Sequence, residues 1–293
     1  MSAKIIDGKQ IANQIREELK AEVEELKSAG ITPGLAVVLV GEDPASQVYV
    51  RRKEKIALEL GFYSLTLRYP QTMTQEELLA SIHRLNEDAK IHGILVQLPL
   101  PDHIDANLVI ETIDPKKDVD GFHPKNVGAL MLGKPIFVPC TPAGIMLLLQ
   151  RAGIDPAGKH AVILGRSNIV GKPMMNLLMQ KQKGANATVT ICHTGTKDFT
   201  VYTKQADILI AAMGKAAVVI GDMLKPGVVV IDVGVNRMDD LSRKSGYRLA
   251  GDVDFTSAAE VASMITPVPG GVGPMTIIML MKNTVRAAKR VRR

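Results

Sequence analysis

The sequence predicts an α/β fold with two domains, an N-terminal α/β domain and a Rossmann-like, doubly wound domain. Short, continuously apolar runs alternate with helical segments along most of the 293 residues, as in parallel βαβ units. A passage rich in Pro and Gly at 114–144 interrupts this alternation, which then starts again. The first strand of the second series runs into a glycine-containing turn at 165–171, where doubly wound sheets bind ligands.

The first series opens with an amphipathic helix. Apolar residues recur every three or four positions from Ile11 to Leu26, and Gly30 and Pro33 end the segment. The pattern then predicts a strand at 35–41, a helix at about 46–60, a strand at 62–69, a helix opened by the capping box Thr74-x-x-Glu77, and a strand at 93–101 that two prolines end.

The second series follows the same scheme. It predicts a strand at 160–165, a helix from about 167 to 180, and further strands at 187–193, 206–214 and 227–234. A loop at 265–274 gives way to a last helix at 275–290. No solenoid-period repeat and no low-complexity tract occurs in the sequence.

Composition argues against several classes of protein. The formal charge is +6, and five cations after residue 285 leave +1 for the rest of the chain. With only ten aromatic residues to stack on bases, a nucleic-acid-binding protein is disfavoured, and the basic tail is best explained as a helix end.

A membrane span and a secretion signal are not expected either. No apolar run reaches the ~18 residues that span a bilayer, and the N-terminus is polar from the start. Cys140 and Cys192 lack the spacing of a metal site or a disulfide framework, and no His, Cys and acid cluster has zinc spacing. We therefore expect no metal and a reducing, cytoplasmic setting.

The turn after the strand at 160–165 is a candidate phosphate-binding loop. Its glycines, Gly165 and Gly171, are spaced G-x5-G rather than GxGxxG, so a plain βα turn is an equal alternative. The next strand is followed by no carboxylate before Asp198, and Arg166 lies inside the loop. Both features favour NADP over NAD, although Arg166 as a solvated surface residue is the alternative.

Tyr49 and Lys53 are four residues apart, so a helix places them on one face. A phenol beside an amine can stack on a ring substrate while the amine acts as acid or base, if burial or a neighbouring cation lowers its pKa. By pattern alone, a solvated lysine-rich helix with one half-buried tyrosine is the favoured alternative.

Polar residues also lie where the strand at 93–101 ends. Gln97 stands among apolar residues at the carboxyl end of this strand, where ligands collect, or it bonds loop backbone. Asp118 and Asp120 precede a glycine, a pattern with three alternative uses: binding a cation, binding a nitrogen heterocycle, or forming a self-capping turn.

Seven motifs appear together in one order along the chain. They are YVRRKEK (49–55), VQLPLP (96–101), KDVDGFHP (117–124), PCTPAG (139–144), GRSNIVGKP (165–173), VIDVGVN (230–236) and ITPVPGGVGPMT (265–276). With them the chain, from about residue 4 to 290, resembles the bifunctional methylenetetrahydrofolate dehydrogenase/methenyltetrahydrofolate cyclohydrolase family, the FolD type. The resemblance outweighs the solvated-lysine alternative for Lys53.

The resemblance implies a reaction and a set of site residues. Such enzymes oxidise 5,10-methylenetetrahydrofolate with NADP to the 5,10-methenyl cation and hydrolyse it to 10-formyltetrahydrofolate, in a cleft between the two domains. The implied catalytic and folate-binding residues are Lys53 as the catalytic lysine, Tyr49 as its pterin-stacking partner, Gln97 as the residue that tunes the lysine, and Asp120 as the residue that holds the pterin amino group. The implied cofactor-binding residues are Gly165, Arg166, Ser167, Thr194 and Val235, and further folate contacts fall on Pro269, Gly270 and Gly271.

The resemblance also implies domain bounds and partners. The folate-binding catalytic domain would comprise 1–139, completed by 269–293, and the NADP-binding domain 140–268. The family commonly forms homodimers, and neither nucleic acid nor membrane is an expected partner. Two other functions stay open: a monofunctional dehydrogenase of the same family, which the intact Lys53 disfavours, and a nucleotide- or RNA-binding module that uses the basic tail.

Overall fold

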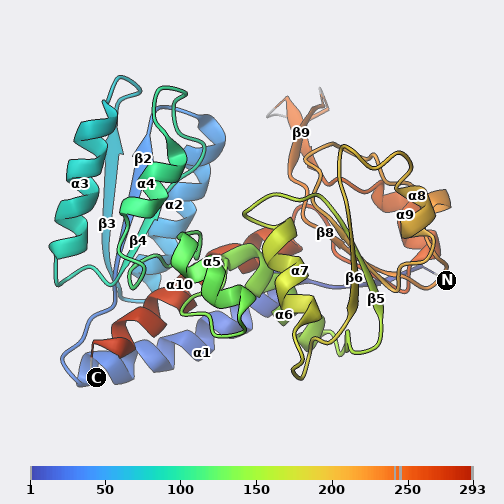
Figure 1. Ribbon diagram of the computed structural model, residues 1–293, viewed down its shortest axis with the longest axis horizontal. Coiled ribbons are helices and arrows are strands. Elements are labelled where there is room, and N and C mark those ends of the chain that lie inside the picture. Colours follow the sequence, from blue (N-terminus) through green and yellow to red (C-terminus); the bar gives the residue numbers. More distant parts are fainter. Residues whose placement is uncertain (1, 241, 244–245, 292–293) are drawn as a thin grey trace. The chain divides into compact units, whose positions relative to one another are not determined.

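A computed structural model describes residues 2–240, 242–243 and 246–291 (Figure 1). The chain divides into two compact units. Unit 1 comprises residues 1–13 and 141–276, and unit 2 comprises residues 14–140 and 277–293. The contacts thus group the first 13 residues with unit 1, whereas the domain bounds expected from the sequence stay a prediction.

Unit 2 is built on a three-stranded parallel sheet in the order β3-β2-β4. Its elements are α2 (Pro44–Glu59), α3 (Gln75–Glu87), α4 (Ala106–Thr112), α5 (Pro124–Met131), β2 (Gly34–Val40), β3 (Tyr63–Tyr69) and β4 (Gly93–Val96), together with most of α1 (Gly8–Ser28) and α10 (Val272–Arg290). The central strand β2 is buried along its whole length, as its unbroken apolar run predicts.

Two helix starts in unit 2 follow from local side-chain chemistry. The capping box at α3 is confirmed, because Glu77 N donates to Thr74 Oγ1 and Thr74 N donates to Glu77 Oε2. Helix α2 begins before the predicted residue 46, since Asp43 caps it by accepting a hydrogen bond from Ser46 N at 2.7 Å. The cap also satisfies a backbone donor that the helix itself leaves unpaired.

The core of unit 2 includes one face of the sheet and two helices. Residues of β2 and β4 pack with the inner faces of α3 and α4, and the cluster includes Ala36, Val38, Leu78, Ile82, Ile94 and Val109. Helix α2 packs against β2 and β3. The predicted strand at 93–101 is shorter than expected and ends at Val96, so Gln97 begins the loop that carries Pro99 and Pro101.

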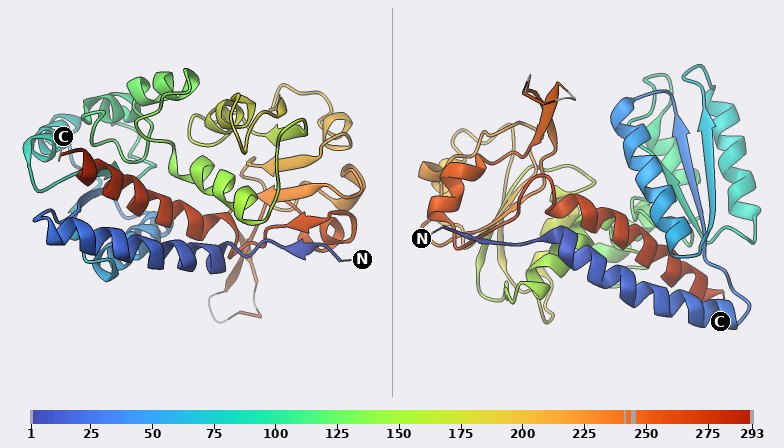
Figure 2. Two further views of the ribbon diagram at one scale, coloured as in Figure 1. Left: turned by 90° about the horizontal axis from the view of Figure 1, so that it is seen from below. Right: turned by 180° about the vertical axis from the view of Figure 1, so that it is seen from behind.

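Unit 1 contains a six-stranded, entirely parallel sheet in the order β1-β11-β8-β7-β5-β6. Its elements are α6 (Cys140–Arg151), α7 (Gly171–Met179), α8 (Thr200–Thr203), α9 (Phe255–Val261), the 3-10 turn η1 (Gly221–Met223), β1 (Lys4–Ile5), β5 (His160–Leu164), β6 (Thr188–Cys192), β7 (Ile208–Ala211), β8 (Val229–Asp232) and β11 (Met264–Ile265), with the antiparallel pair β9 (Asn236–Asp239) and β10 (Tyr247–Ala250) beside them. Figure 2 shows this pair extending from the sheet.

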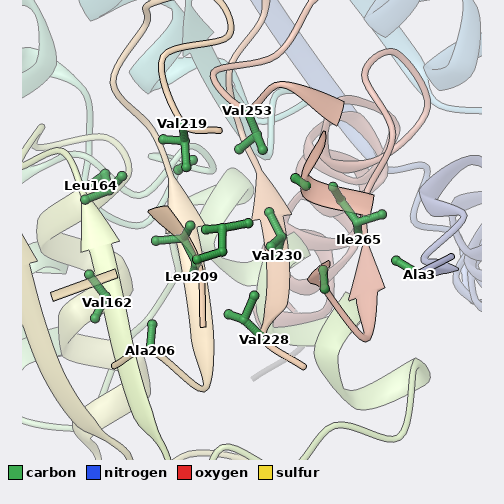
Figure 3. Close-up of a cluster of buried hydrophobic side chains, with 14 of the residues drawn as sticks. Ala3, Val162, Leu164, Ala206, Leu209, Val219, Val228, Val230, Val253 and Ile265 are labelled. Carbon is green, nitrogen blue, oxygen red and sulfur yellow. The ribbon is translucent and has the colours of Figure 1, made fainter. Parts of the chain in front are cut away.

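The register of this sheet explains its core. Val162 pairs with Leu209 and Leu209 with Val230, so their side chains share one face, where they pack with residues of α9 such as Ala258 (Figure 3). Helix α7 packs against β5 and β6. The chain passes from β5 to β6, which lies on one side of β5 in the sheet, and then to β7, which lies on the other side. The boundary between β5 and β7 is therefore a topological switch point.

Candidate active site

Three of the catalytic residues expected in the first series, Lys53, Gln97 and Asp120, lie together where strand β4 ends. Lys53 lies on α2, in the buried stripe that also contains Ser46, Val50 and Ala57. Its side chain is 6% exposed, whereas Arg51, Arg52 and Lys55 of the same helix are exposed. The solvated-lysine interpretation is therefore wrong for Lys53.

Lys53 and Gln97 form the central contact of this site. Lys53 Nζ donates to Gln97 Oε1 at 2.9 Å, and Gln97 Nε2 donates to the carbonyl of Leu98 at 2.7 Å. The second bond fixes the amide so that its oxygen faces the amine. Gln97 thus bonds loop backbone, as one alternative proposed, and contacts Lys53 at the same time.

Burial sets the protonation chemistry of this cluster. Burial lowers the pKa of Lys53, and the negative charge of Asp120 opposes that change. Burial also raises the pKa of Asp120, while the cation of Lys53 acts in the opposite direction. An amine with a lowered pKa exchanges protons nearer neutrality than an exposed lysine does.

The two acids of the KDVDG motif have separate roles. The carboxylate of Asp118, which is 2% exposed, accepts hydrogen bonds from the backbone N–H groups of Gly121, Phe122 and His123 and from Asn126 Nδ2. Asp118 therefore forms the turn, as the self-capping alternative proposed. Asp118 also makes a bridge to Ile94, which brings the neighbouring Asp120 to the end of β4.

Two residues outside the predicted site, Asn283 and Cys140, hold the backbone next to Asp120. Asn283 of α10 is buried, and its Nδ2 donates to the carbonyls of Val119 at 2.8 Å and Val138 at 3.0 Å. The thiol of Cys140 donates to the same Val119 carbonyl at 3.4 Å, and burial raises the pKa of this thiol well above its usual range. A lone asparagine on the buried face of an apolar helix was the available signal for Asn283.

Tyr49 lies one turn before Lys53 on α2 and is partly buried. The four-residue spacing places the two side chains on the same face of the helix, as predicted. The phenol therefore lies on the side of α2 that carries the amine.

The cofactor-binding residues expected in the second series lie in unit 1. Gly165 follows β5 with φ +123°, a conformation that favours glycine, and a Cβ there would overlap the carbonyl of Ala212. A Cβ on Gly171 would overlap the carbonyl of Gly165, so both glycines allow the turn to close tightly onto α7. The turn brings the N-terminus of α7 to the switch point, which fits a phosphate-bearing cofactor.

The polar residues of this loop fit a phosphorylated nucleotide. Arg166 is exposed in the loop, and Ser167 Oγ accepts a hydrogen bond from Val170 N at 3.1 Å. Helix α7 starts at Gly171 rather than at 167, because the intervening residues form this loop. Thr194 follows β6 on the surface, and Val235 is 48% exposed after β8.

The closing loop of unit 1 contains the other expected folate contacts. Gly270 has φ +113° and its carbonyl accepts a hydrogen bond from Lys9 N, while Pro269 is exposed. A Cβ on Gly271 would lie 2.7 Å from both Thr266 and the carbonyl of Pro267. Packing inside unit 1 is therefore sufficient to require glycine at 271.

Among residues 2–240, 242–243 and 246–291, no group of three or more His, Cys, Asp or Glu side chains is placed to hold a metal ion. In the same part of the chain, no helix is long and apolar enough to cross a membrane.

Comparison with known proteins assigns the family. Residues 6–120 match the family described as "Tetrahydrofolate dehydrogenase/cyclohydrolase, catalytic domain", and residues 139–292 match its "NAD(P)-binding domain". The chain belongs to the tetrahydrofolate dehydrogenase/cyclohydrolase family. The predicted family and the predicted two-domain α/β fold are confirmed.

Relatives from bacteria match over the whole chain. The "Bifunctional protein FolD" of Moorella thermoacetica is 60% identical and that of Prosthecochloris aestuarii 58% identical, with 99% and 98% of this chain and 100% and 98% of those proteins covered. These matches confirm the predicted enzyme, a bifunctional dehydrogenase/cyclohydrolase.

Solved structures agree with this assignment. The bifunctional enzyme from Campylobacter jejuni is 52% identical, with a TM-score of 0.93 and 99% and 100% of the two chains covered. The Trypanosoma brucei enzyme, solved with NADP and an inhibitor, is 42% identical, with a TM-score of 0.95 and 100% and 99% coverage. Together with the NAD(P)-binding domain, this complex supports the predicted cofactor.

Proposed function

We propose that this chain oxidises 5,10-methylenetetrahydrofolate with NADP and hydrolyses the resulting 5,10-methenyl cation to 10-formyltetrahydrofolate, and that Lys53 serves the hydrolysis. The observation that carries the proposal is the hydrogen bond from the buried Lys53 to Gln97, beside Asp120, in a chain of this family. A surface lysine would hold its proton too tightly to exchange it during hydrolysis near neutrality.

Asp120 and Tyr49 would bind and orient the pterin. As a carboxylate, Asp120 would accept hydrogen bonds from the 2-amino group and N3 of the pterin, a bidentate arrangement that fixes the ring. Tyr49, on the side of α2 that carries Lys53, would stack on that ring. The two contacts together would hold the folate one-carbon unit against Lys53.

The oxidation demands positioning rather than acid–base chemistry. When bound, NADP supplies the acceptor for the hydride that leaves the methylene carbon. Gly165 and Ser167 would shape the phosphate-binding turn, and Arg166 would pair with the 2′-phosphate. Thr194 and Val235 would make further nucleotide contacts, and Pro269, Gly270 and Gly271 would contact the folate.

The hydrolysis requires proton transfer at three points. Water adds to the methenyl carbon and loses a proton, which leaves a hydroxyl group on that carbon. The bond from the carbon to one folate nitrogen then breaks as that nitrogen gains a proton and the hydroxyl group loses its proton to become the formyl carbonyl. The neutral amine of Lys53 would accept the proton from water, or its ammonium form would donate to the leaving nitrogen. Gln97 would hold the amine in place for either role.

The basic tail does not favour the RNA-binding alternative. Lys289 pairs with Glu22 at 2.6 Å, and Arg286 Nη2 donates to the carbonyl of Pro135. These cations lie in the last turns of α10, where they complement the helix dipole. A truncation after Thr284 would also remove the buried Val285, so Arg290→Glu is the better probe of RNA affinity.

The setting and assembly complete the proposal. We infer a cytoplasmic homodimer that acts on tetrahydrofolate derivatives without nucleic-acid or membrane partners and that supplies one-carbon units, purine biosynthesis included. The two buried, free cysteines support a reducing, cytoplasmic setting. Membership of the family supports the assembly and the folate substrates.

The test follows absorbance in one cuvette. With methylenetetrahydrofolate and NADP, we expect NADPH to form and the methenyl chromophore to rise and then decay. Methenyl accumulation without enzyme-dependent decay would favour the monofunctional dehydrogenase. If no folate is turned over while salt-dependent RNA binding is lost in Arg290→Glu, the enzyme proposal is wrong.

A further inference from the structure

Two buried carboxylates, those of Asp232 and Asp252, lie near the carboxyl ends of β7 and β8, each against the backbone beside the other acid. Asp232 ends β8 and is 4% exposed, and Asp252 follows β10 and is fully buried. The carboxylate of Asp232 lies against Gly251, the residue before Asp252, and the carboxylate of Asp252 lies against Gly234, two residues after Asp232. A Cβ on Gly251 would overlap the carboxylate of Asp232, and a Cβ on Gly234 would overlap that of Asp252. Only glycine fits at either position.

Asp252 holds the loop that follows β7. Its carboxylate accepts hydrogen bonds from the backbone N–H groups of Met213, Gly214 and Lys215, the last two at 3.0 Å each. Three successive N–H groups that converge in this way make an anion-binding nest, and here the anion is the protein's own side chain. Asn236 Nδ2 donates to the same carboxylate at 2.9 Å.

Asp232 in turn holds Asp252. It accepts hydrogen bonds from the backbone N–H groups of Asp252 at 2.9 Å, Val253 at 3.0 Å and Gly234 at 2.9 Å. The backbone of Asp252 is thus anchored to the end of β8. The two acids therefore form a chain of support that runs from β8 to the loop 213–215.

The supported loop lies beside the proposed cofactor turn. Strands β5 and β7 are paired neighbours, and Gly165 packs against the carbonyl of Ala212, directly before the loop. This boundary is the switch point of the sheet, where doubly wound folds bind nucleotides. The buried Asp252 carboxylate faces the backbone of the loop, so its influence on a ligand runs through that backbone.

We propose that Asp252, anchored by Asp232, is a positioning residue that holds the loop 213–215 in the geometry that binds NADP. This inference rests on the proposed function. It assigns a role in cofactor affinity to two buried acids whose carboxylates accept hydrogen bonds from backbone N–H groups of the protein itself.

Equilibrium binding of NADP tests the inference without any turnover. Asp252→Asn replaces one acceptor oxygen by a donor that faces N–H groups, so we expect titration calorimetry to give an NADP Kd about tenfold higher. The Kd for tetrahydrofolate should stay within about twofold, because none of the groups that the Asp252 carboxylate bonds belongs to a residue proposed to bind the folate. A selective loss of NADP affinity is not expected from a merely structural role.

Asp207→Asn is the matched control. Asp207 lies at the amino end of β7 and accepts hydrogen bonds from His160 N and Lys225 Nζ, far along the strand from the loop. This variant should lose thermal stability and keep its NADP Kd within about twofold. Unchanged NADP affinity in Asp252→Asn, or an equal loss in Asp207→Asn, would overturn the inference.

Hydrogen exchange in the unmodified protein gives a second test if Asp252→Asn does not fold. The amides of Met213, Gly214 and Lys215 should be protected in the cofactor-free protein, because Asp252 already accepts their hydrogen bonds. Exchange at the rate of an exposed loop would overturn the inference. Failure of the unmodified protein to bind NADP would instead overturn the proposed function, and this inference with it.

Discussion

The amine of Lys53 donates a hydrogen bond to Gln97 Oε1 across 2.9 Å, from a side chain that is almost fully buried. The two residues are 44 positions apart, and the pairing of β2 with β4 brings them together. A neutral amide accepts this bond without adding charge. It therefore leaves the pKa of Lys53 low, where a carboxylate would raise it.

Gln97→Glu tests the effect of a neutral acceptor. A carboxylate beside the amine favours the ammonium form, so the pKa of Lys53 should rise, by about one unit or more. The pH–rate profile of methenyl hydrolysis should move to higher pH by the same amount, whether Lys53 acts as base or as acid. Gln47→Glu, near the start of the same helix, is the control, and an unmoved profile in Gln97→Glu would refute the role of Gln97.

Asn283→Leu tests the support of Asp120 from α10. It leaves the carbonyls of Val119 and Val138 without this donor, at a cost of about 1–3 kcal/mol in the free energy of unfolding. If that anchor positions Asp120, KM for methylenetetrahydrofolate should rise roughly fivefold while the NADP Kd stays constant.

Thr284→Val is the matched control for Asn283→Leu. Thr284 is also buried, but its hydroxyl donates to the carbonyl of Leu280 within α10. We expect a lower melting temperature and an unaltered KM for the folate. If Asn283→Leu has the same KM for methylenetetrahydrofolate as the unmodified protein, then α10 does not position Asp120.

Arg166→Ala tests cofactor selectivity. If Arg166 pairs with the 2′-phosphate, the ratio of kcat/KM for NADP to that for NAD should fall by about tenfold or more. Lys172→Ala removes an equal charge from the same turn, where Lys172 Nζ bonds Asn168 Oδ1 at 2.7 Å. Lys172→Ala should leave the ratio unchanged. If Arg166→Ala also leaves it unchanged, Arg166 is a solvated surface residue and does not bind the 2′-phosphate.

Asp232 should make stability depend on pH in an unusual direction. Burial raises its pKa from 3.8 to about 6, against the lowering effect of three backbone hydrogen bonds. Between these values the folded state binds more protons than the unfolded state, so the group's contribution to stability is lost as pH rises from about 4 to about 6 and stays lost above. The shift corresponds to about 3 kcal/mol at 1.36 kcal/mol per unit.

Chemical denaturation at pH 4 and pH 7 measures this effect. The difference in unfolding free energy between Asp232→Asn and the unmodified protein should change in favour of the variant by about 2 kcal/mol over that range, since part of the full shift lies below pH 4. Asp207→Asn should change in the opposite direction, because Lys225 and the His160 N–H lower the pKa of Asp207. If the unfolding free energies of Asp232→Asn and the unmodified protein differ by the same amount at pH 4 and at pH 7, the account of Asp232 is wrong.

Regular elements with a clear periodicity were predictable from the sequence. The buried strand β2 and the Thr74 capping box are where the pattern placed them. The passage 114–144 instead contains α5 and the start of α6, since Pro124 and Pro142 stand in the first helical turn, where proline is tolerated. The pair β9 and β10 was missed because short polar strands lack an apolar signal.

The site was predictable in part. Motifs identified Lys53, Gln97 and Asp120, while the pattern alone favoured an exposed lysine, because the burial of Lys53 depends on how α2 packs on the sheet. The supporting residues Asn283 and Asp252 belong to segments distant in sequence from the groups they hold. Such contacts follow from the tertiary fold and have no local signature.

The most direct test of the central claim compares Lys53→Met with Lys55→Met in the two-step absorbance assay. Lys55 is exposed on the same helix and pairs with Glu59 at 3.9 Å, so its replacement should alter neither step. Lys53→Met should slow decay of the methenyl chromophore by about a hundredfold or more, and slow NADPH formation far less, because the oxidation needs no proton transfer from the lysine. Methenyl decay at the unmodified rate in Lys53→Met would contradict the account.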